Sequence, residues 1–225
     1  MCFSASASFA ASALLLPAGL YSVRLAALQN PKYIPLATIP IAFAAQQACE
    51  GLTWLGLMEG AVTVTNLGAL GFLGFAYWFW LFWAPWSVAQ LEPHPIIQRV
   101  SRSLSVIGLI YGSLLYLPLW IHPDWLEVDV FHHSIQYTTR LIFDLWFSQD
   151  FDRVIYALII LIPFFLASNH ALRWFAGAIA VSALLSHWLL HQVFVSVWCF
   201  FAALLSGLIV LICQTTSTEN SQQLL

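Results

Sequence analysis

An acidic residue, Glu50, lies within an otherwise apolar stretch, QQACEGLTWLGL, which covers residues 46–57. A charged side chain in the bilayer core costs about 2.5–3.5 kcal/mol on insertion scales, so such a group is buried against partners, protonated or functional. On a helix, Gln46, Gln47 and Trp54 lie on parts of the face that adjoin Glu50. Two interpretations stay open: a carboxylate that acts in catalysis or binding, and a Gln-bonded carboxyl that locks helices together.

Two histidines, His187 and His191, are four residues apart, so a helix would present both imidazoles on one face. With this spacing a helix can supply two nitrogens to one metal ion. Glu50 and either His132 or His133 could complete a site for zinc or another transition metal, which would acidify a bound water. The alternative is a pair of interfacial histidines that hydrogen-bond to the backbone or to lipid headgroups.

The cysteines have two interpretations. Cys2 and Cys199 are predicted to lie in the same membrane half, where a disulfide could hold the N-terminus to the last span. Cys2 could instead serve as a nucleophile or a metal ligand. The alternative without chemistry is that the cysteines pack as small apolar residues.

The elements that position these residues must lie in a membrane. The chain has 225 residues, of which 61% are hydrophobic and only 8% charged, whereas a soluble domain carries about 25% charged residues. Such a chain has too little polar side-chain surface for water, so lipid must be the solvent for most of it. The net charge of −3 and the scattered basic residues exclude a nucleic-acid-binding class.

The chain contains seven apolar segments of about 20 residues, the length that crosses a bilayer. We therefore predict an all-α membrane protein, with a single seven-helix transmembrane domain over residues 1–213 and a disordered tail over residues 214–225. The predicted spans cover residues 5–28, 34–58, 65–90, 98–121, 153–169, 171–190 and 194–213.

Basic residues are distributed unequally between the two sides of this arrangement. Five lie in or beside the first, third and fifth connections, and two lie in the fourth connection, on the other side. The positive-inside rule then places the N-terminus outside and the C-terminus inside. The five are Arg24, Lys32, Arg99, Arg102 and Arg173, and the two are Arg140 and Arg153.

The longest connection, residues 122–152, lies outside in this orientation. Residues 125–137 alternate in part and are β-branched and aromatic, which predicts a short strand or hairpin. Residues 138–152 are predicted to form an amphipathic helix on the membrane surface. A long connection with its own structure is more often a lid or docking surface than a tether, so we expect it to close over a polar site around Glu50.

An aromatic run, AYWFWLFWAPW, covers residues 76–86. Such a density of rings could stack on a haem, a pigment or a lipid. Aromatic residues in membrane helices more often serve in packing and as interface anchors, and both interpretations stay open.

Five segments together resemble an uncharacterised family of small bacterial multi-pass membrane proteins. They are MCFSA at the start, QQACEGLTWLGL at 46–57, LEPHP at 91–95, HHSIQY at 132–137 and SVWC at 196–199. The resemblance implies a membrane architecture, and we expect a bacterial inner membrane, but it implies no chemistry. It draws attention to the residues on the recurring segments, with Gln47, Trp54 and Tyr137 as candidate ligand-binding residues: Cys2, Gln47, Glu50, Trp54, His133, Ser134, Tyr137 and Cys199.

The chain is also similar, as a fold-level analogy, to the seven-span superfamily of alkaline ceramidases and adiponectin receptors. The span count and the spacing of His187 and His191 match a superfamily whose members hold zinc with histidines. This likeness implies a zinc-dependent membrane hydrolase. The Ser and Asp companions expected on earlier helices are not evident in the sequence.

Two functions stand as hypotheses. The first is a metal-dependent membrane hydrolase of lipid or amide substrates, in which the histidines hold the metal and Glu50 takes a proton from the bound water. The second is a non-catalytic protein that holds a small ligand, lipid, pigment or haem under the outer loop, or that packs against a larger membrane-protein partner. A transporter is favoured least, because the spans carry few charges and no repeat.

Overall fold

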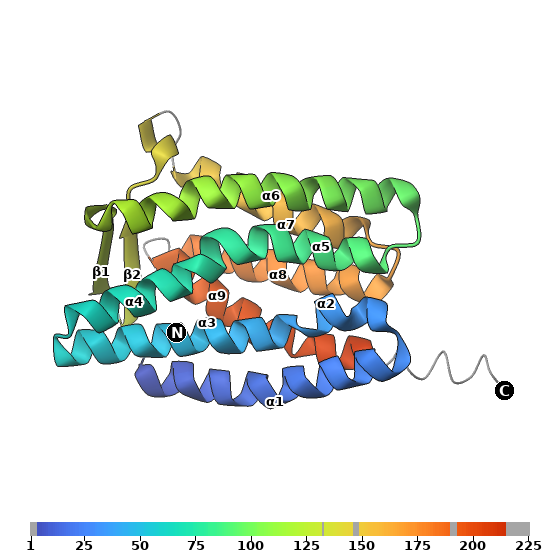
Figure 1. Ribbon diagram of the computed structural model, residues 1–225, viewed down its shortest axis with the longest axis horizontal. Helices are drawn as coiled ribbons and strands as arrows, with labels where there is room; N and C mark the ends of the chain where they lie inside the picture. The colour runs from blue at the N-terminus through green and yellow to red at the C-terminus, as the bar shows by residue number, and fades with distance from the viewer. Residues whose placement is uncertain (1–3, 132, 146–148, 190–192, 215–225) are drawn as a thin grey trace.

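The computed structural model describes residues 4–131, 133–145, 149–189 and 193–214, and this part of the chain is predominantly helical (Figure 1). The α-helices are α1 (Ala5–Gln29), α2 (Ile34–Ala37), α3 (Ile39–Glu59), α4 (Val62–Leu73), α5 (Trp80–Leu91), α6 (Pro95–Ile121), α7 (Gln149–Leu166), α8 (His170–Leu189) and α9 (Phe194–Ser206). Short 3₁₀ turns are η1 (Pro31–Tyr33), η3 (Pro123–Trp125) and η4 (Ile142–Leu145). A π-helical turn, η2 (Gly74–Phe79), joins α4 to α5. The strands are β1 (Leu126–Phe131) and β2 (Ser134–Thr139).

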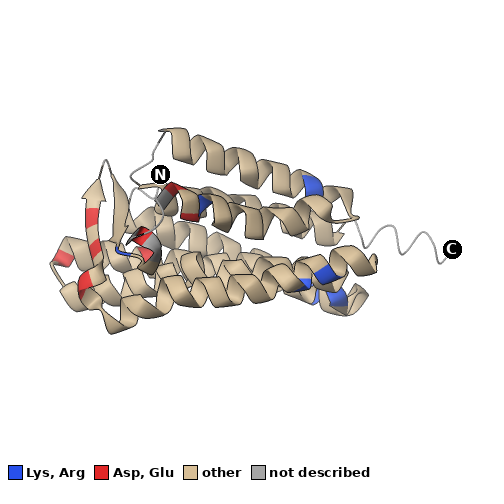
Figure 2. Ribbon diagram, turned by 90° about the horizontal axis from the view of Figure 1, so that it is seen from above, with Lys and Arg blue, Asp and Glu red and all other residues tan. Residues whose placement is uncertain are grey.

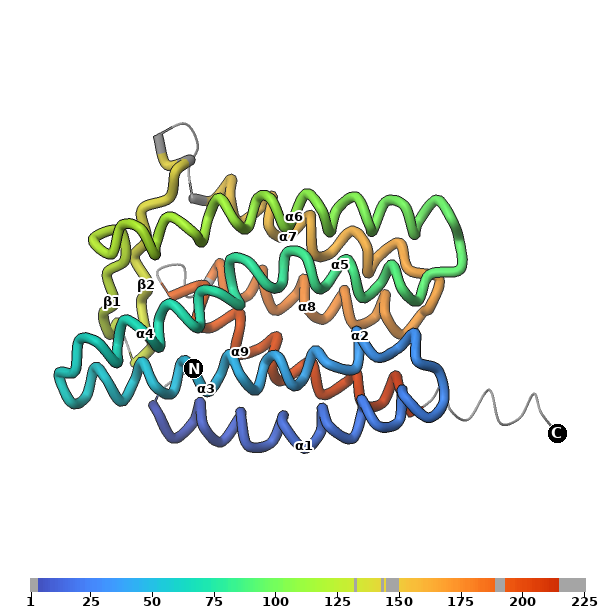
Figure 3. The backbone as a smooth tube through the Cα atoms, viewed as in Figure 1, coloured from blue at the N-terminus to red at the C-terminus, as the bar shows by residue number. Residues whose placement is uncertain are grey.

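The long helices lie along the long axis of the molecule, as the ribbon and the backbone trace both show (Figures 1 and 3). Each of the seven apolar segments predicted from the sequence is helical over most of its length. Four helices of the described chain are long and apolar enough to cross a membrane, which supports a membrane protein. They are Ala5–Gln29, Val62–Leu91, Pro95–Ile121 and Phe194–Gln214.

Short connections with clear stop signals turn the chain between helices. The Ser4 side chain caps α1 by accepting a 3.3 Å hydrogen bond from the N–H of Ala7. Gly60 ends α3 with a φ of 66°, a left-handed conformation that glycine adopts without a steric penalty. Pro95 begins α6 at a position where a helix needs no N–H donor. These signals make consecutive long helices antiparallel neighbours.

The predicted hairpin is confirmed. β1 and β2 pair antiparallel, with Val128 opposite Tyr137 and Val130 opposite Ile135. The sheet stands at one end of the helices (Figure 1), and β2 is the more buried of its two strands. Ile135 is completely buried, so β2 covers this end of the core.

The predicted amphipathic helix over residues 138–152 is wrong. Thr138 and Thr139 complete β2, because β-branched residues fit a strand better than a helix. Among the described residues between β2 and α7, one short helical turn, η4, is present. In this turn the Asp144 carboxylate accepts a 2.8 Å hydrogen bond from the Leu141 N–H, a local bond that competes with a longer helix.

The fifth predicted segment, residues 153–169, is shifted in the structure, where α7 begins four residues earlier and ends at Leu166. Asp150 and Asp152 occupy the first turn of α7. Carboxylates at a helix N-terminus favour the helix dipole, so these two residues extend the helix beyond the apolar run. The predicted disordered tail lies outside the described residues from position 215 onward.

Helix α6 packs closely against the segment that precedes it. A Cβ atom at Gly108 would overlap the Leu81 carbonyl, and one at Gly112 would lie 2.7 Å from the Tyr77 carbonyl oxygen. Two glycines four residues apart therefore let the helix backbones approach, as small residues commonly do in membrane helices.

Charged residues are segregated between the two ends of the molecule. Figure 2 shows mostly acidic residues near the hairpin and basic residues toward the opposite end. The segregation agrees with the unequal distribution of basic residues along the sequence.

Candidate functional site

Glu50 lies inside the protein, on a face of α3 that is packed rather than exposed. Its side chain is 0% exposed, as are those of Gln46 and Gln47 one turn earlier. Helix α3 contacts α1, α4 and α9. Burying three polar side chains is costly unless they are hydrogen-bonded, so this face of α3 must find its partners within the protein.

Hydrogen bonds join these polar residues to two other helices. Ser196 of α9 donates to one Glu50 oxygen at 2.6 Å, and the Gln47 amide donates to the other at 3.3 Å. The Trp80 indole of α5 donates to the Gln46 side chain at 2.8 Å. Both oxygens of Glu50 therefore accept hydrogen bonds, an arrangement that suits a carboxylate.

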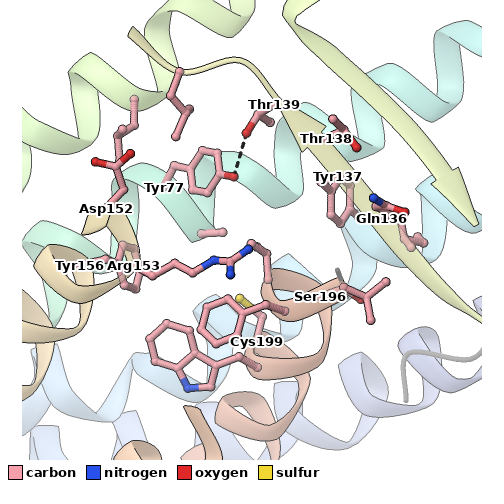
Figure 4. Close-up of a pocket in the computed structure, with 18 residues that line it drawn as sticks. Tyr77, Gln136, Tyr137, Thr138, Thr139, Asp152, Arg153, Tyr156, Ser196 and Cys199 are labelled. Carbon is pink, nitrogen blue, oxygen red and sulfur yellow. Dashed lines mark hydrogen bonds between the residues drawn. The ribbon is translucent and has the colours of Figure 1, made fainter. Parts of the chain in front are cut away.

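A cavity of about 240 Å³ lies beneath the hairpin, between β2, α7 and α9 (Figure 4). Residues of β2 form one wall, and Tyr77 of η2 lies on another. Tyr77 and Thr139 share a 3.1 Å hydrogen bond, which ties the hairpin to the helices. The cavity is lined by both polar and apolar side chains, as small-molecule sites commonly are.

Two charged residues of α7 reach this cavity. In Figure 4, Arg153 extends across it below Tyr77. The Arg153 guanidinium lies 3.0 Å from an Asp150 oxygen and 5.0 Å from the centre of the Phe194 ring. Asp152 is 6% exposed, and one of its oxygens accepts a 2.7 Å hydrogen bond from Tyr111. The cavity thus offers one cation and one carboxylate among hydroxyl groups.

Ser196 connects the cavity to Glu50, because this residue is part of the cavity wall and its hydroxyl donates to the carboxylate. Cys199, one helical turn further along α9, lines the same cavity. A group bound in the cavity would therefore lie one side chain away from the buried carboxylate. From there Glu50 could accept a proton or hold a hydrogen-bond chain.

The three residues predicted to bind a ligand have different surroundings. Tyr137 lines the cavity and stacks on Phe72, with ring centres 4.9 Å apart. Gln47 is not part of the cavity wall. Its amide donates to Glu50, which in turn accepts a hydrogen bond from Ser196 of the wall. Trp54 is buried on α3, and its N–H has no hydrogen-bond partner among the described residues.

The structure describes two of the four predicted metal-binding histidines. His133 is exposed at the hairpin turn with a φ of 60°, and His187 is exposed near the end of α8, with its ring 6.0 Å from that of Phe194. His132 and His191 lie outside the described residues. Within the described ranges, no group of three or more His, Cys, Asp and Glu residues could hold a metal ion. The metal site stays a prediction.

Cys199 is a buried free thiol, and Cys213 is likewise buried and free. Cys2 lies outside the described residues, so its pairing with Cys199 and its role as a nucleophile stay predictions. Burial of Cys199 in the cavity wall agrees with packing as a small apolar residue.

The aromatic run at 76–86 makes contacts between helices. The Trp83 indole donates to the Pro35 carbonyl and to the Thr38 hydroxyl, each at 3.1 Å, and the Trp78 indole donates to Ser113 at 3.1 Å. The ring of Trp80 stacks on Phe43 at 4.0 Å. These contacts favour the packing interpretation, and pigment or haem binding stays a prediction.

Reasoning from sequence missed several residues of the cavity: Tyr77, Asp152, Arg153 and Ser196. The spacing of Ser196 and Cys199, three residues apart on one helix, was a usable signal for Ser196. For Tyr77 the signal was hidden, because η2 is a π-helical turn inside a longer helix. Such turns change the direction of side chains and are frequent at functional sites.

A third buried carboxylate, Glu92, lies at the opposite end of the molecule, in the α5–α6 connection. Its oxygens accept hydrogen bonds from the Ser168 hydroxyl at 2.6 Å, the Ser168 N–H at 2.9 Å and the His94 N–H at 3.1 Å. Burial raises the pKa of Glu92, but these hydrogen bonds and the charge of His94 outweigh it, so the pKa lies below its usual value. Glu92 thus holds two connections together.

The comparison with family models matches residues 1–223 to a family of unknown function, DUF6629. The chain belongs to this family. Membership agrees with the resemblance to an uncharacterised family, and the likeness to alkaline ceramidases stays a prediction. No curated protein and no solved structure matches the chain.

Proposed function

We propose that this family member crosses the membrane seven times, with its N-terminus outside and its C-terminus inside a bacterial inner membrane. The segregated charges support this orientation, because most basic residues lie at the end opposite the hairpin (Figure 2). Helix α3 is less apolar than a typical span because it carries Gln46, Gln47 and Glu50. All three are buried, so none of these polar side chains faces lipid.

We propose that the protein binds a small amphipathic molecule in the cavity beneath the hairpin, reached from the outer side. The observation that carries this function is the link from the cavity through Ser196 to the Glu50 carboxylate. Burying a polar network is unfavourable unless its groups are hydrogen-bonded. Beside a cavity, such a network can hydrogen-bond to a ligand. The volume of about 240 Å³ is below the 300–1,000 Å³ typical of drug-sized ligands, so the bound portion is small.

Purification in a mild detergent tests this function. Mass spectrometry of an organic extract identifies any molecule that remains bound, and thermal unfolding measures its effect on stability. Arg153→Met removes the cation of the cavity while keeping side-chain length. Arg140→Met is the matched control, because Arg140 is exposed and does not line the cavity.

We expect the wild type and Arg140→Met to retain the same bound molecule and Arg153→Met to lose it. The function is wrong if no variant, including the wild type, carries or is stabilised by any small molecule. An absorption spectrum of the same sample tests for haem or pigment, and co-purification tests for a membrane-protein partner.

The second candidate is the hydrolase predicted from the sequence. One observation favours it: Glu50 reaches the cavity through a serine hydroxyl, a position suited to a general base. The metal version needs His132 or His133 together with His187 and His191. Elemental analysis of the purified protein tests it, and the absence of stoichiometric zinc or another transition metal would end it.

A further inference from the structure

A second cavity, of about 60 Å³, lies next to the first and is walled almost entirely by apolar side chains. Its walls come from α3, α5, α7, α8 and α9. Tyr156, Trp198 and Cys199 line both cavities, so these residues form the boundary between the two spaces. The Tyr156 and Trp198 rings stand edge to face, 5.5 Å apart. We call this pair with Cys199 the neck.

One face of α7 runs along both cavities. We call the first cavity, beneath the hairpin, the upper cavity and the second the lower cavity. Asp152 and Tyr156 line the upper cavity, and Tyr156, Ile160 and Phe164 line the lower one. Residues four apart share a helix face, and the rise from Asp152 to Phe164 is roughly 18 Å. Polarity therefore falls along this face from a carboxylate to hydrocarbon, as it does along a single-chain lipid. On α9, Ser196 and Ala202 show the same order above and below the neck.

Two polar atoms along this path are buried without a hydrogen-bond partner among the described residues. They are the second carboxylate oxygen of Asp152, a residue of the upper cavity, and the indole N–H of Trp198, a residue of the neck. A buried acceptor or donor without a hydrogen-bond partner destabilises the fold, so each needs a partner. A hydroxyl would satisfy Asp152, and a carbonyl would satisfy Trp198.

We propose that the two cavities together bind one single-chain acyl lipid with a hydroxyl-bearing head, such as a monoacylglycerol. The head hydroxyl donates to Asp152, the ester carbonyl accepts from Trp198 at the neck, and the acyl chain enters the lower cavity. This proposal rests on the proposed binding function and names its ligand class. It assigns the apolar cavity to the acyl chain.

Binding of 1-monoacylglycerols of increasing chain length to the purified full-length chain tests the proposal. Each methylene that enters the lower cavity should tighten binding about fourfold, from a transfer free energy of about 0.8 kcal/mol per CH₂. The gain should stop once the chain fills the cavity. Trp198→Phe, which lacks the indole N–H, should weaken esters while leaving the matching alkyl ethers less affected.

Ala202→Leu narrows the lower cavity and should end the gain at a shorter chain, while the shortest monoacylglycerol binds as before. Ala13→Leu, at an exposed position of α1, is the matched control and should behave as the wild type. Circular dichroism and gel filtration show whether each variant is folded. The chain-length series on the wild type tests the proposal even if a variant fails to fold.

Equal affinity for all chain lengths would overturn the assignment of the lower cavity and leave small-molecule binding in the upper cavity intact. If the wild type binds an extracted molecule but no monoacylglycerol, the ligand class is wrong. If it binds neither, the proposed function itself has failed.

Discussion

Ser196 in α9 donates a 2.6 Å hydrogen bond to Glu50 in α3, although 146 positions separate the two residues in the sequence. The bond joins the second and last long helices at the wall of the main cavity. The bond offsets part of the cost of burying the Glu50 carboxylate. It also places the hydrogen-bonded group of Gln47, Glu50 and Ser196 next to the cavity.

Loss of this bond should weaken the packing of α9 on α3. Ser196→Ala removes the 2.6 Å hydrogen bond to Glu50, and we expect the free energy of unfolding to fall by about 1–3 kcal/mol. Ser206→Ala is a matched control on the same helix, because the buried Ser206 hydroxyl donates only to the Ala203 carbonyl of its own helix. Thermal unfolding in detergent measures both. Equal effects of the two substitutions would contradict a special role for the bond to Glu50.

Acid should weaken the junction around Glu92. Since its pKa is lowered on folding, the ionised form stabilises the fold fully above the unfolded-state value. This stability is lost as the pH falls through the folded-state pKa. Glu92→Ala removes the acceptor for Ser168 and His94, and we expect a loss of about 2 kcal/mol at neutral pH.

Measurement of unfolding against pH checks the sign of this effect. The difference between wild type and Glu92→Ala should be largest near neutral pH and shrink in acid. A difference that stays constant down to strongly acidic pH would mean that the charge of Glu92 contributes nothing.

The close approach of α6 to the preceding segment should not tolerate a side chain. Gly108→Ala places a methyl group against the Leu81 carbonyl, and we expect a loss of about 1–3 kcal/mol. Gly177→Ala is the control, because a Cβ atom there meets nothing within 4 Å. In a helix this control should be neutral or stabilising by up to about 1 kcal/mol. Thermal unfolding measures the stability of both variants. An unchanged stability of Gly108→Ala would contradict the close contact between α6 and the Leu81 carbonyl.

The proposed orientation predicts which ends of the helices are accessible from outside the cell. Glu59 and Lys32 are both exposed, at opposite ends of the molecule. In a chain without its natural cysteines, a membrane-impermeant maleimide should label Glu59→Cys in intact cells and label Lys32→Cys only after permeabilisation. Labelling of Lys32→Cys alone in intact cells would reverse the orientation.

The sequence by itself determined the helical segments and the hairpin. Runs of about 20 apolar residues can satisfy their backbone only as helices in lipid, and alternation with β-branched residues favours a strand. It also singled out Glu50 as a residue that is costly to bury and residues 134–137 as part of the longest connection. It was wrong over residues 138–145, where strand, turn and helix preferences compete and local hydrogen bonds decide.

Only the tertiary structure decided what meets Glu50. The predicted histidines that the structure describes, His133 and His187, are exposed, whereas Ser196 reaches the carboxylate. Helix periodicity tells which residues share a face but not which face of another helix lies opposite. That choice depends on how all the helices pack together, because close contacts such as the one at Gly108 set the distance and rotation of each pair. The cavity exists for the same reason, since its walls come from segments far apart in the chain.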